Sequence, residues 1–411
     1  MRIERDAYVN RLIEHKHNGM VKVITGARRC GKSYVLFELF RQHLRDAGVP
    51  DDHVIAVALD DRQYKALRDP DACDAYVRAR IQPGQCYVLI DEVQLMDEFE
   101  DVVSGFMHIE NADVYITGSN SRFLSTDVIT EFRGRGDELR IHPLTFAEYY
   151  GVRGGDWDDA YNEYLVYGGM PYACTLARAE DKMDYLQHLF RETYVRDIVE
   201  RNSLQHESEL ETLMDIVASA VGSLTNPDKL SRSFRSVKNL SLSAPTIKRY
   251  LGFLEDAFLV HAVKRFDVKG KQYLSTPVKY YFEDVGVRNA LLNFRQHEPT
   301  HLMENVIYNE LIARGLAVDV GIVDMTHAGK RKRVEIDFVA TRGSERFYIQ
   351  SAFALADEAK RDQELRPLLA TRDAFKKIVI VGGSAPVTRD EHGIVTMGIK
   401  QFLLDASSLD A

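Results

Sequence analysis

One eight-residue segment constrains this chain more than any other. It reads Gly26-Ala27-Arg28-Arg29-Cys30-Gly31-Lys32-Ser33 and follows the short β-branched run at residues 21–25. Residues 34–40 come next and carry apolar side chains at helical spacing. A strand, a G-x-x-x-x-G-K-S loop and a helix in this order predict a phosphate-binding loop. The two glycines allow the backbone to turn successive N–H groups toward an anion.

The residue types in this loop suit ATP with Mg²⁺. The N–H groups and the helix start would hold phosphates, Lys32 would add a positive charge for the β- and γ-phosphates, and the Ser33 hydroxyl would bind Mg²⁺. Arg28 and Arg29 would either contact the nucleotide or pair with surface acids. The expected nucleotide-binding residues are Gly26, Ala27, Arg28, Arg29, Cys30, Gly31, Lys32, Ser33 and Tyr34.

A second buried-strand run, residues 87–90, ends in Asp91-Glu92. Asp91 is expected to hold Mg²⁺ through its hydration shell, and Glu92 to act as the general base that polarises the attacking water. Further strands are expected at 54–59 and 113–117, and the latter is followed by Gly118-Ser119-Asn120-Ser121. Alternating strands and helices favour a parallel sheet with its ligand at the strand C-termini. Asn120 or Ser119 would then sense the γ-phosphate; the alternative is a helix cap or turn.

These segments resemble the AAA-type ATPases of bacteria and archaea that have an additional strand between the two Walker strands. The resemblance extends to the segment from Gly134 to Tyr149 and to Tyr167-Gly168-Gly169-Met170-Pro171, which closes the nucleotide domain in relatives. It implies that Arg133 or Arg135 is an arginine finger, acting in cis or on a neighbouring subunit of a homo-oligomer. A planar cation there would stabilise charge on the transferred phosphoryl group. A solvated loop arginine is the alternative.

Composition narrows the remaining classes. The 411 residues carry a formal net charge of −9, which excludes a chain that is basic throughout. Four cysteines without a C-x-x-C pair argue against a disulfide framework or a structural zinc site. The charged start and the short apolar runs predict a cytoplasmic protein with no membrane segment.

The middle of the chain changes in character. Residues 173–204 are expected to form a helical connector after an ATPase domain at 1–172. Residues 228–279 hold eleven basic against four acidic residues, and helical patterns there precede a hairpin turn at Lys269-Gly270-Lys271. The pattern indicates a winged-helix-like domain at 205–282, which relatives also carry. Two alternatives stay open: DNA binding through residues 229–271, or packing against protein.

Residues 283–411 are expected to form a mixed α/β domain, and the resemblance implies a restriction-endonuclease-like fold. Such sites use a helix acid, a strand Asp and then Glu-x-Lys. Glu304 and Asp337 fill the first two places, but the third reads Gln350-Ser351-Ala352, and spacing gives no support for compensation by Lys360. We therefore expect a catalytically degenerate domain.

The fold class predicted is α/β: a P-loop NTPase with an AAA-type (ASCE) parallel sheet, then a winged helix, then a nuclease-like domain. The expected activity is Mg²⁺-dependent ATP hydrolysis coupled to rearrangement of the two downstream modules. The alternative is a nucleotide-gated DNA-binding switch with little turnover. A kinase fits less well, because the Asp91-Glu92 pair favours water as the acceptor.

Overall fold

The computed structural model describes residues 2–118, 132, 134–204, 207–238, 242–296, 298–327, 330–355 and 358–410. The contacts divide the chain into two compact units. The first comprises residues 1–143 and 256–258, and the second comprises residues 144–255 and 259–411. The division therefore falls after Pro143, about thirty residues before the end of the ATPase domain expected from sequence.

A parallel five-stranded sheet forms the centre of the first unit, in the order β2-β3-β4-β1-β5. Strand β4 lies between β1 and β3, which confirms the α/β class and the additional strand that the resemblance implied. Strand β5 was not predicted, because its sequence GDELR lacks the apolar run of a buried strand. The bounds are β1 Val21–Thr25, β2 Val54–Ala58, β3 Cys86–Asp91, β4 Ala112–Thr117 and β5 Gly136–Arg140.

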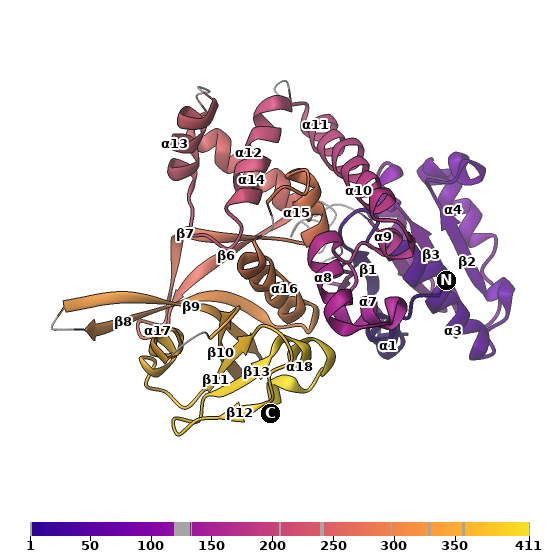
Figure 1. The fold of residues 1–411 in the computed structure, drawn as a ribbon. Coiled ribbons are helices and arrows are strands. Elements are labelled where there is room, and N and C mark those ends of the chain that lie inside the picture. Colours follow the sequence, from indigo (N-terminus) through magenta and orange to yellow (C-terminus); the bar gives the residue numbers. More distant parts are fainter. Residues whose placement is uncertain are drawn as a thin grey trace. The chain divides into compact units, whose positions relative to one another are not determined.

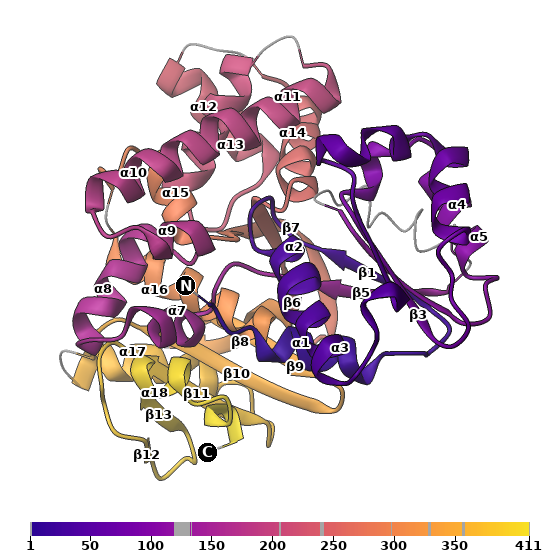
Figure 2. The ribbon, with the colours of Figure 1, turned by 90° about the vertical axis from the view of Figure 1, so that its right-hand side faces the viewer.

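Helices cover both faces of this sheet (Figure 2). On one face, apolar side chains of α4 and α5 pack with Val23, Ile55 and Val57. On the other, α1 and the long helix after the loop pack with Ile24 and Leu89. The bounds are α1 Asp6–Glu14, α2 Lys32–Tyr34, a wider π-helical stretch Val35–Phe40, α3 Arg41–Asp46, α4 Pro70–Arg78 and α5 Phe99–Phe106. Both faces are thus buried, as the continuous apolar strands predict.

The second unit begins with helices (Figure 1). They are α7 Phe146–Arg153, α8 Trp157–Tyr167, α9 Pro171–Thr175, α10 Ala179–His188, a π-helical stretch Leu189–Val195, α11 Arg196–Asn202, α12 Glu207–Ser219, α13 Pro227–Lys238 and α14 Ala244–Asp256. Residues 173–204 are helical, as predicted. Later helices are α15 Val285–Leu291, α16 Pro299–Ala313, α17 Glu358–Leu369 and α18 Ile399–Leu404.

An eight-stranded mixed sheet runs through the second unit in the order β12-β13-β11-β10-β9-β8-β6-β7. The hairpin β6–β7, expected to be a wing, pairs through β6 with β8, where Arg265 lies opposite Val320. The expected boundary at residue 282 therefore runs through one continuous sheet. The bounds are β6 Val260–Asp267, β7 Gln272–Phe282, β8 Ala317–His327, β9 Lys330–Arg342, β10 Glu345–Ala352, β11 Lys376–Val381, β12 Thr388–Arg389 and β13 Val395–Gly398.

The Tyr167-Gly168-Gly169 segment crosses the start of α15 at close range. The Asp284 carboxylate accepts from the Gly169 N–H at 2.7 Å and from the Val287 N–H at 2.9 Å. A Cβ on Gly168 would lie 2.3 Å from an Asp284 oxygen. The segment therefore belongs to a packed crossing inside the second unit, rather than closing the nucleotide domain as the resemblance implied.

Candidate functional site

The loop between β1 and α2 is held in a shape that only glycine fits at its first position. Gly26 has φ 140°, and a Cβ there would lie 2.0 Å from the carbonyl oxygen of Ile141. Gly31 has φ 106° at the position just before the helix. These are the conformations that direct N–H groups into a loop, so the expected anion cradle has its backbone basis.

Lys32 lies at the first position of the helix and is buried at 4% exposure. Its ammonium donates to the carbonyl oxygens of Gly26 at 3.1 Å and Ala27 at 3.0 Å. The positive charge of Lys32 therefore lies against carbonyl groups of the loop itself. An ammonium satisfied by two carbonyls of the loop can exchange them for phosphate oxygens without leaving the site.

Asp91 ends β3 beside the helix start. It is 3% exposed and accepts a hydrogen bond from the Thr117 hydroxyl at the end of β4. Burial raises the pKa of Asp91, while hydrogen bonds from Thr117 and Ser33 oppose that rise. Ser33 and Asp91, both expected to serve Mg²⁺, therefore lie near each other, since Ser33 contributes to the pKa of Asp91.

Glu92 adopts a left-handed backbone conformation with φ 52° directly after β3. Its N–H donates to the Thr117 hydroxyl at 3.0 Å, and its carboxylate accepts from the Gln94 amide. A non-glycine residue in this conformation is strained unless its surroundings hold it. Thr117 therefore orients both acids, through the Asp91 side chain and the Glu92 backbone.

The other residues predicted to bind the nucleotide differ in how exposed their side chains are. Arg28 and Arg29 are exposed, and Arg29 has φ 64°. Cys30 is buried, and its thiol donates to the Ile141 carbonyl at 3.2 Å, so its side chain faces the interior. The Tyr34 hydroxyl accepts from the Ile3 N–H at 3.1 Å. The Cys30 and Tyr34 side chains therefore bond within the protein.

Of the candidates for a sensor and an arginine finger, Ser119, Asn120 and Arg133 lie outside the described residues. Arg135 is exposed, and its carbonyl accepts from the Val21 N–H at 2.9 Å. It therefore stands just before β5 at the N-terminal end of β1, because parallel β1 and β5 pair from Val21 opposite Gly136. The site itself lies at the other, C-terminal end of β1.

Sequence reasoning missed Arg5. This guanidinium is 1% exposed and donates to the carbonyl of Cys30 at 3.2 Å and to that of His142 at 2.8 Å. It also lies 4.6 Å from the centre of the Tyr8 ring. Arg5 thus braces the phosphate loop from inside the fold, and no local motif could have indicated this.

Only some of the basic residues between 228 and 279 lie on the surface of the protein. Lys279, included in its charge excess, is buried among three acids, which removes it from any outward-facing charge. On α14, Lys248 and Arg249 are exposed, while Ile247, Tyr250 and Leu251 are buried. Among the residues of this stretch whose exposure is described, the other exposed basic ones are Lys229, Arg232, Lys264, Lys269 and Lys271.

The nuclease-like positions come together, but with a cation that sequence did not suggest. Glu304 on α16 and Asp337 on β9 both contact Lys279 of β7. Gln350 accepts from the Asp337 N–H at 3.4 Å and donates to Glu364 at 3.0 Å. Lys360 pairs with Glu364 at 2.5 Å. Within the described part of the chain, no group of three or more His, Cys, Asp or Glu side chains is arranged to hold a metal ion.

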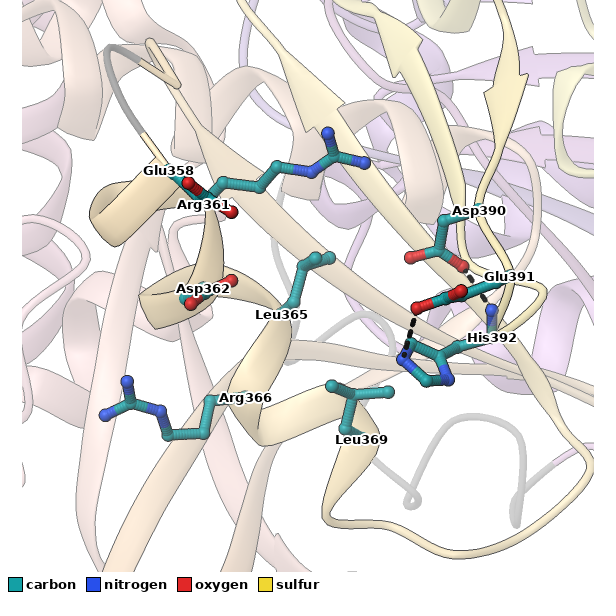
Figure 3. A pocket seen from close by; sticks show the side chains of 9 residues that line it. All are labelled: Glu358, Arg361, Asp362, Leu365, Arg366, Leu369, Asp390, Glu391 and His392. Carbon is teal, nitrogen blue, oxygen red and sulfur yellow. Dashed lines mark hydrogen bonds and ion pairs between the residues drawn. The ribbon is translucent and has the colours of Figure 1, made fainter.

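A separate hollow of about 570 Å³ lies between α17 and the turn before β13 (Figure 3). Its lining is Glu358, Arg361, Asp362, Leu365, Arg366, Leu369, Asp390, Glu391 and His392. His392 contacts both neighbours, since its backbone N–H donates to the Asp390 carboxylate at 2.9 Å and its ring Nε2 lies 3.7 Å from Glu391. The mixture of acids and bases selects no charge class of ligand.

Family comparisons divide the chain in two. A family model described as an AAA domain matches residues 18–150, which confirms the AAA-type assignment made from sequence for this part. A model described as a domain of unknown function matches residues 158–298. None of the helices among the described residues has the length and apolarity needed to cross a bilayer.

Two proteins are similar to this chain over most of its length. An uncharacterized protein of Haemophilus influenzae is 32% identical over 387 residues, covering 92% of this chain and 93% of that protein. An uncharacterized protein of Methanocaldococcus jannaschii is 27% identical over 427 residues, covering 98% and 89%. The Aeropyrum pernix ORC1 protein in complex with DNA covers 71% of this chain and 92% of its own at 12% identity, with a TM-score of 0.30. A TM-score of this size does not establish a shared fold.

Proposed function

The chain belongs to the same family as the uncharacterized Haemophilus influenzae protein, and we propose that it binds Mg²⁺-ATP in its AAA domain and hydrolyses it. One observation carries the proposal. Ser33, which follows Lys32 at the helix start, lies close enough to the buried Asp91 carboxyl to lower its pKa by hydrogen bonding. Hydroxyl and carboxylate oxygens are the donors Mg²⁺ prefers, so the residues present fit the ion.

Each residue has a role that follows from its position. The N–H groups of residues 26–34 hold the phosphates, and Lys32 moves from the Gly26 and Ala27 carbonyls to the β- and γ-phosphates. Ser33 and Asp91 hold Mg²⁺, which supplies charge neutralisation when bound. Glu92 accepts a proton from the attacking water. Asn120 as sensor completes the proposed set, together with a finger that is Arg133, or Arg135 acting on a neighbouring subunit.

Two substitutions test the assignment. Lys32→Ala should abolish ATP binding, whereas Glu92→Gln should retain binding and lower kcat by about 10²- to 10⁴-fold. Calorimetry measures the binding, and phosphate release measures the turnover. Lys65→Ala, which changes an exposed lysine outside the loop, is the control. Undiminished turnover in both site variants would refute the proposal.

The second candidate function is DNA binding gated by the nucleotide. Its support is α14, which buries one apolar face and exposes Lys248 and Arg249, in a helix–helix–hairpin order of the winged-helix kind. Residue Thr225 pairs antiparallel with Val278 of β7, as the first short strand of such a module would. Phosphate contacts by these cations would bind duplex DNA without sequence preference.

Fluorescence anisotropy against salt separates DNA binding from protein packing. The affinity for a DNA duplex should fall as salt rises, and the double substitution Lys248→Glu with Arg249→Glu should weaken binding and reduce the slope by about 2. ATPase rates with and without DNA then show whether binding gates turnover. An affinity independent of salt would leave the module as a protein-packing element.

We also assign the eight-stranded unit a restriction-endonuclease-like fold without nuclease activity, rearranged by the ATPase cycle. The support is the placement of Glu304 and Asp337 on α16 and β9 together with the amide and methyl at Gln350 and Ala352. A plasmid-nicking assay with Mg²⁺ or Mn²⁺ should show no cleavage. Cleavage that is lost in Asp337→Ala would overturn the assignment.

A further inference from the structure

A buried lysine stands at the centre of the acids in the second unit. The Lys279 ammonium lies 2.8 Å from Glu304, 2.7 Å from Glu335 and 3.6 Å from Asp337. Its side chain is 4% exposed, and the four groups come from β7, α16 and β9. We call Lys279, Glu304, Glu335 and Asp337 the lysine centre.

The acids of this centre are held in place by other groups as well. The Tyr281 hydroxyl donates to Glu304 at 2.5 Å, and the Ser351 N–H donates to Asp337 at 2.9 Å. Burial, and next the charge of Glu304, raise the pKa of Asp337 to about 7, while Lys279 opposes that rise. Burial alone would lower the pKa of Lys279, but the surrounding acids raise it well above its usual value. The acids therefore need a cation, and Lys279 is the cation they have.

The distances describe a centre that is filled by an ammonium. Mg²⁺ and Ca²⁺ bind oxygen at about 2.0–2.6 Å and take six or more ligands. The observed distances of 2.7–3.6 Å are those of hydrogen bonds and ion pairs to an ammonium, which has three protons to give. The ammonium thus has Glu304 and Glu335 within hydrogen-bond range and Asp337 as a longer ion pair.

We propose that Lys279 occupies the place of a divalent cation in this centre, so that the natural chain takes no metal there and removal of the lysine side chain creates a metal site. Solvent has a route in, because the Glu335 side chain is 30% exposed. The created site would take a hard cation such as Ca²⁺, Mn²⁺ or Tb³⁺ through Glu304, Glu335 and Asp337. The inference is independent of the proposed ATPase function.

Tyrosine-sensitised Tb³⁺ luminescence gives a readout at this position. Tyr281 is bonded to Glu304 and stacks on Tyr308 with ring centres 4.5 Å apart, so a Tb³⁺ ion among the acids would lie beside a tyrosine. The full chain, treated with chelator and free of nucleotide, is titrated with Tb³⁺ and separately with Ca²⁺ in a thermal unfolding assay. In Lys279→Ala, Tb³⁺ emission should appear and Ca²⁺ should raise the unfolding midpoint by several degrees. The natural chain should lack this added emission and this added shift, because the proposed site at Ser33 and Asp91 is common to both chains.

Two controls locate the effect. Lys279→Ala combined with Asp337→Asn should lose both responses, whereas Lys264→Ala, an exposed lysine on β6, should behave like the natural chain. A response that survives Asp337→Asn, or the lack of any response in a folded Lys279→Ala, would overturn the proposal. If Lys279→Ala does not fold, anomalous scattering from natural-chain crystals soaked in Mn²⁺ decides. Density in the lysine centre contradicts the proposal, and clear absence supports it.

Discussion

Arg5 shows how a single residue outside a motif can set the motif's shape. Its guanidinium is buried and joins the Cys30 carbonyl in the loop to the His142 carbonyl after β5. Arg5→Met removes both hydrogen bonds. We expect KM for ATP to rise about tenfold, equivalent to about 1.4 kcal/mol, with a smaller change in kcat.

Steady-state kinetics measures this split between KM and kcat. Arg5→Lys, which keeps the charge and a donor, should recover part of the affinity, and Arg11→Met, exposed on α1, should match the natural chain. If Arg5 only stabilised the fold, Arg5→Met would lower the unfolding temperature and leave KM unchanged in assays well below it.

At this scale the sequence predicted candidate residues for the site but not the residues that hold them in place. Lys32, Ser33 and Asp91 were found because their spacing follows a local motif. Arg5, Thr117 and Lys279 were missed as functional residues, because each acts through partners at least 25 positions away. A lysine in a basic stretch carries the same sequence signal whether it faces solvent or three carboxylates.

At the scale of elements, the crossing of Tyr167-Gly168 over α15 leaves no room for a side chain at position 286. A Cβ on Gly286 would lie 2.0 Å from the Tyr167 carbonyl oxygen, so Gly286→Ala must displace backbone. We expect a loss of about 3 kcal/mol or more of unfolding free energy. Gly252→Ala, on α14 with no atom within 4 Å, should be neutral or stabilise by up to ~1 kcal/mol. Chemical denaturation of both variants tests the contrast.

The Asp284 carboxyl at the same crossing predicts that the stability of the fold depends on pH. Burial raises the pKa of Asp284 to about 6, against hydrogen bonds from the Gly169 and Val287 N–H groups. A raised carboxyl pKa means that the folded chain binds the proton more tightly than the unfolded chain. Its contribution to stability is therefore complete below about pH 4 and is lost as pH rises through 6.

The comparison with Asp284→Asn isolates this contribution, because an amide does not titrate. The unfolding midpoint of the natural chain minus that of Asp284→Asn should decrease from pH 4 to pH 7. Differential scanning fluorimetry across this range measures it. A difference that grows with pH would mean that the Asp284 carboxylate is stabilised in its charged form.

At the scale of the whole molecule, the division after Pro143 and the shared sheet predict which fragments fold. A fragment of residues 144–411 keeps the β6–β8 pairing and the lysine centre, so it should unfold cooperatively. A fragment of residues 283–411 leaves β8 with an unpaired edge and Glu304 without Lys279. It should be largely unfolded or aggregated by circular dichroism and size-exclusion chromatography. A stable 283–411 fragment would restore the boundary expected from sequence.

The sequence by itself determined the nucleotide domain, because its information is local: a loop, a helix start and acids at the end of a buried strand lie within short, patterned segments. Only the tertiary structure decided that the hairpin of residues 260–282 is part of the larger sheet, that Arg5 supports the loop, and that Lys279 lies among acids. The physical reason is that strand pairing and buried ion pairs join residues far apart in the chain. Their energies depend on burial, which composition and spacing do not encode.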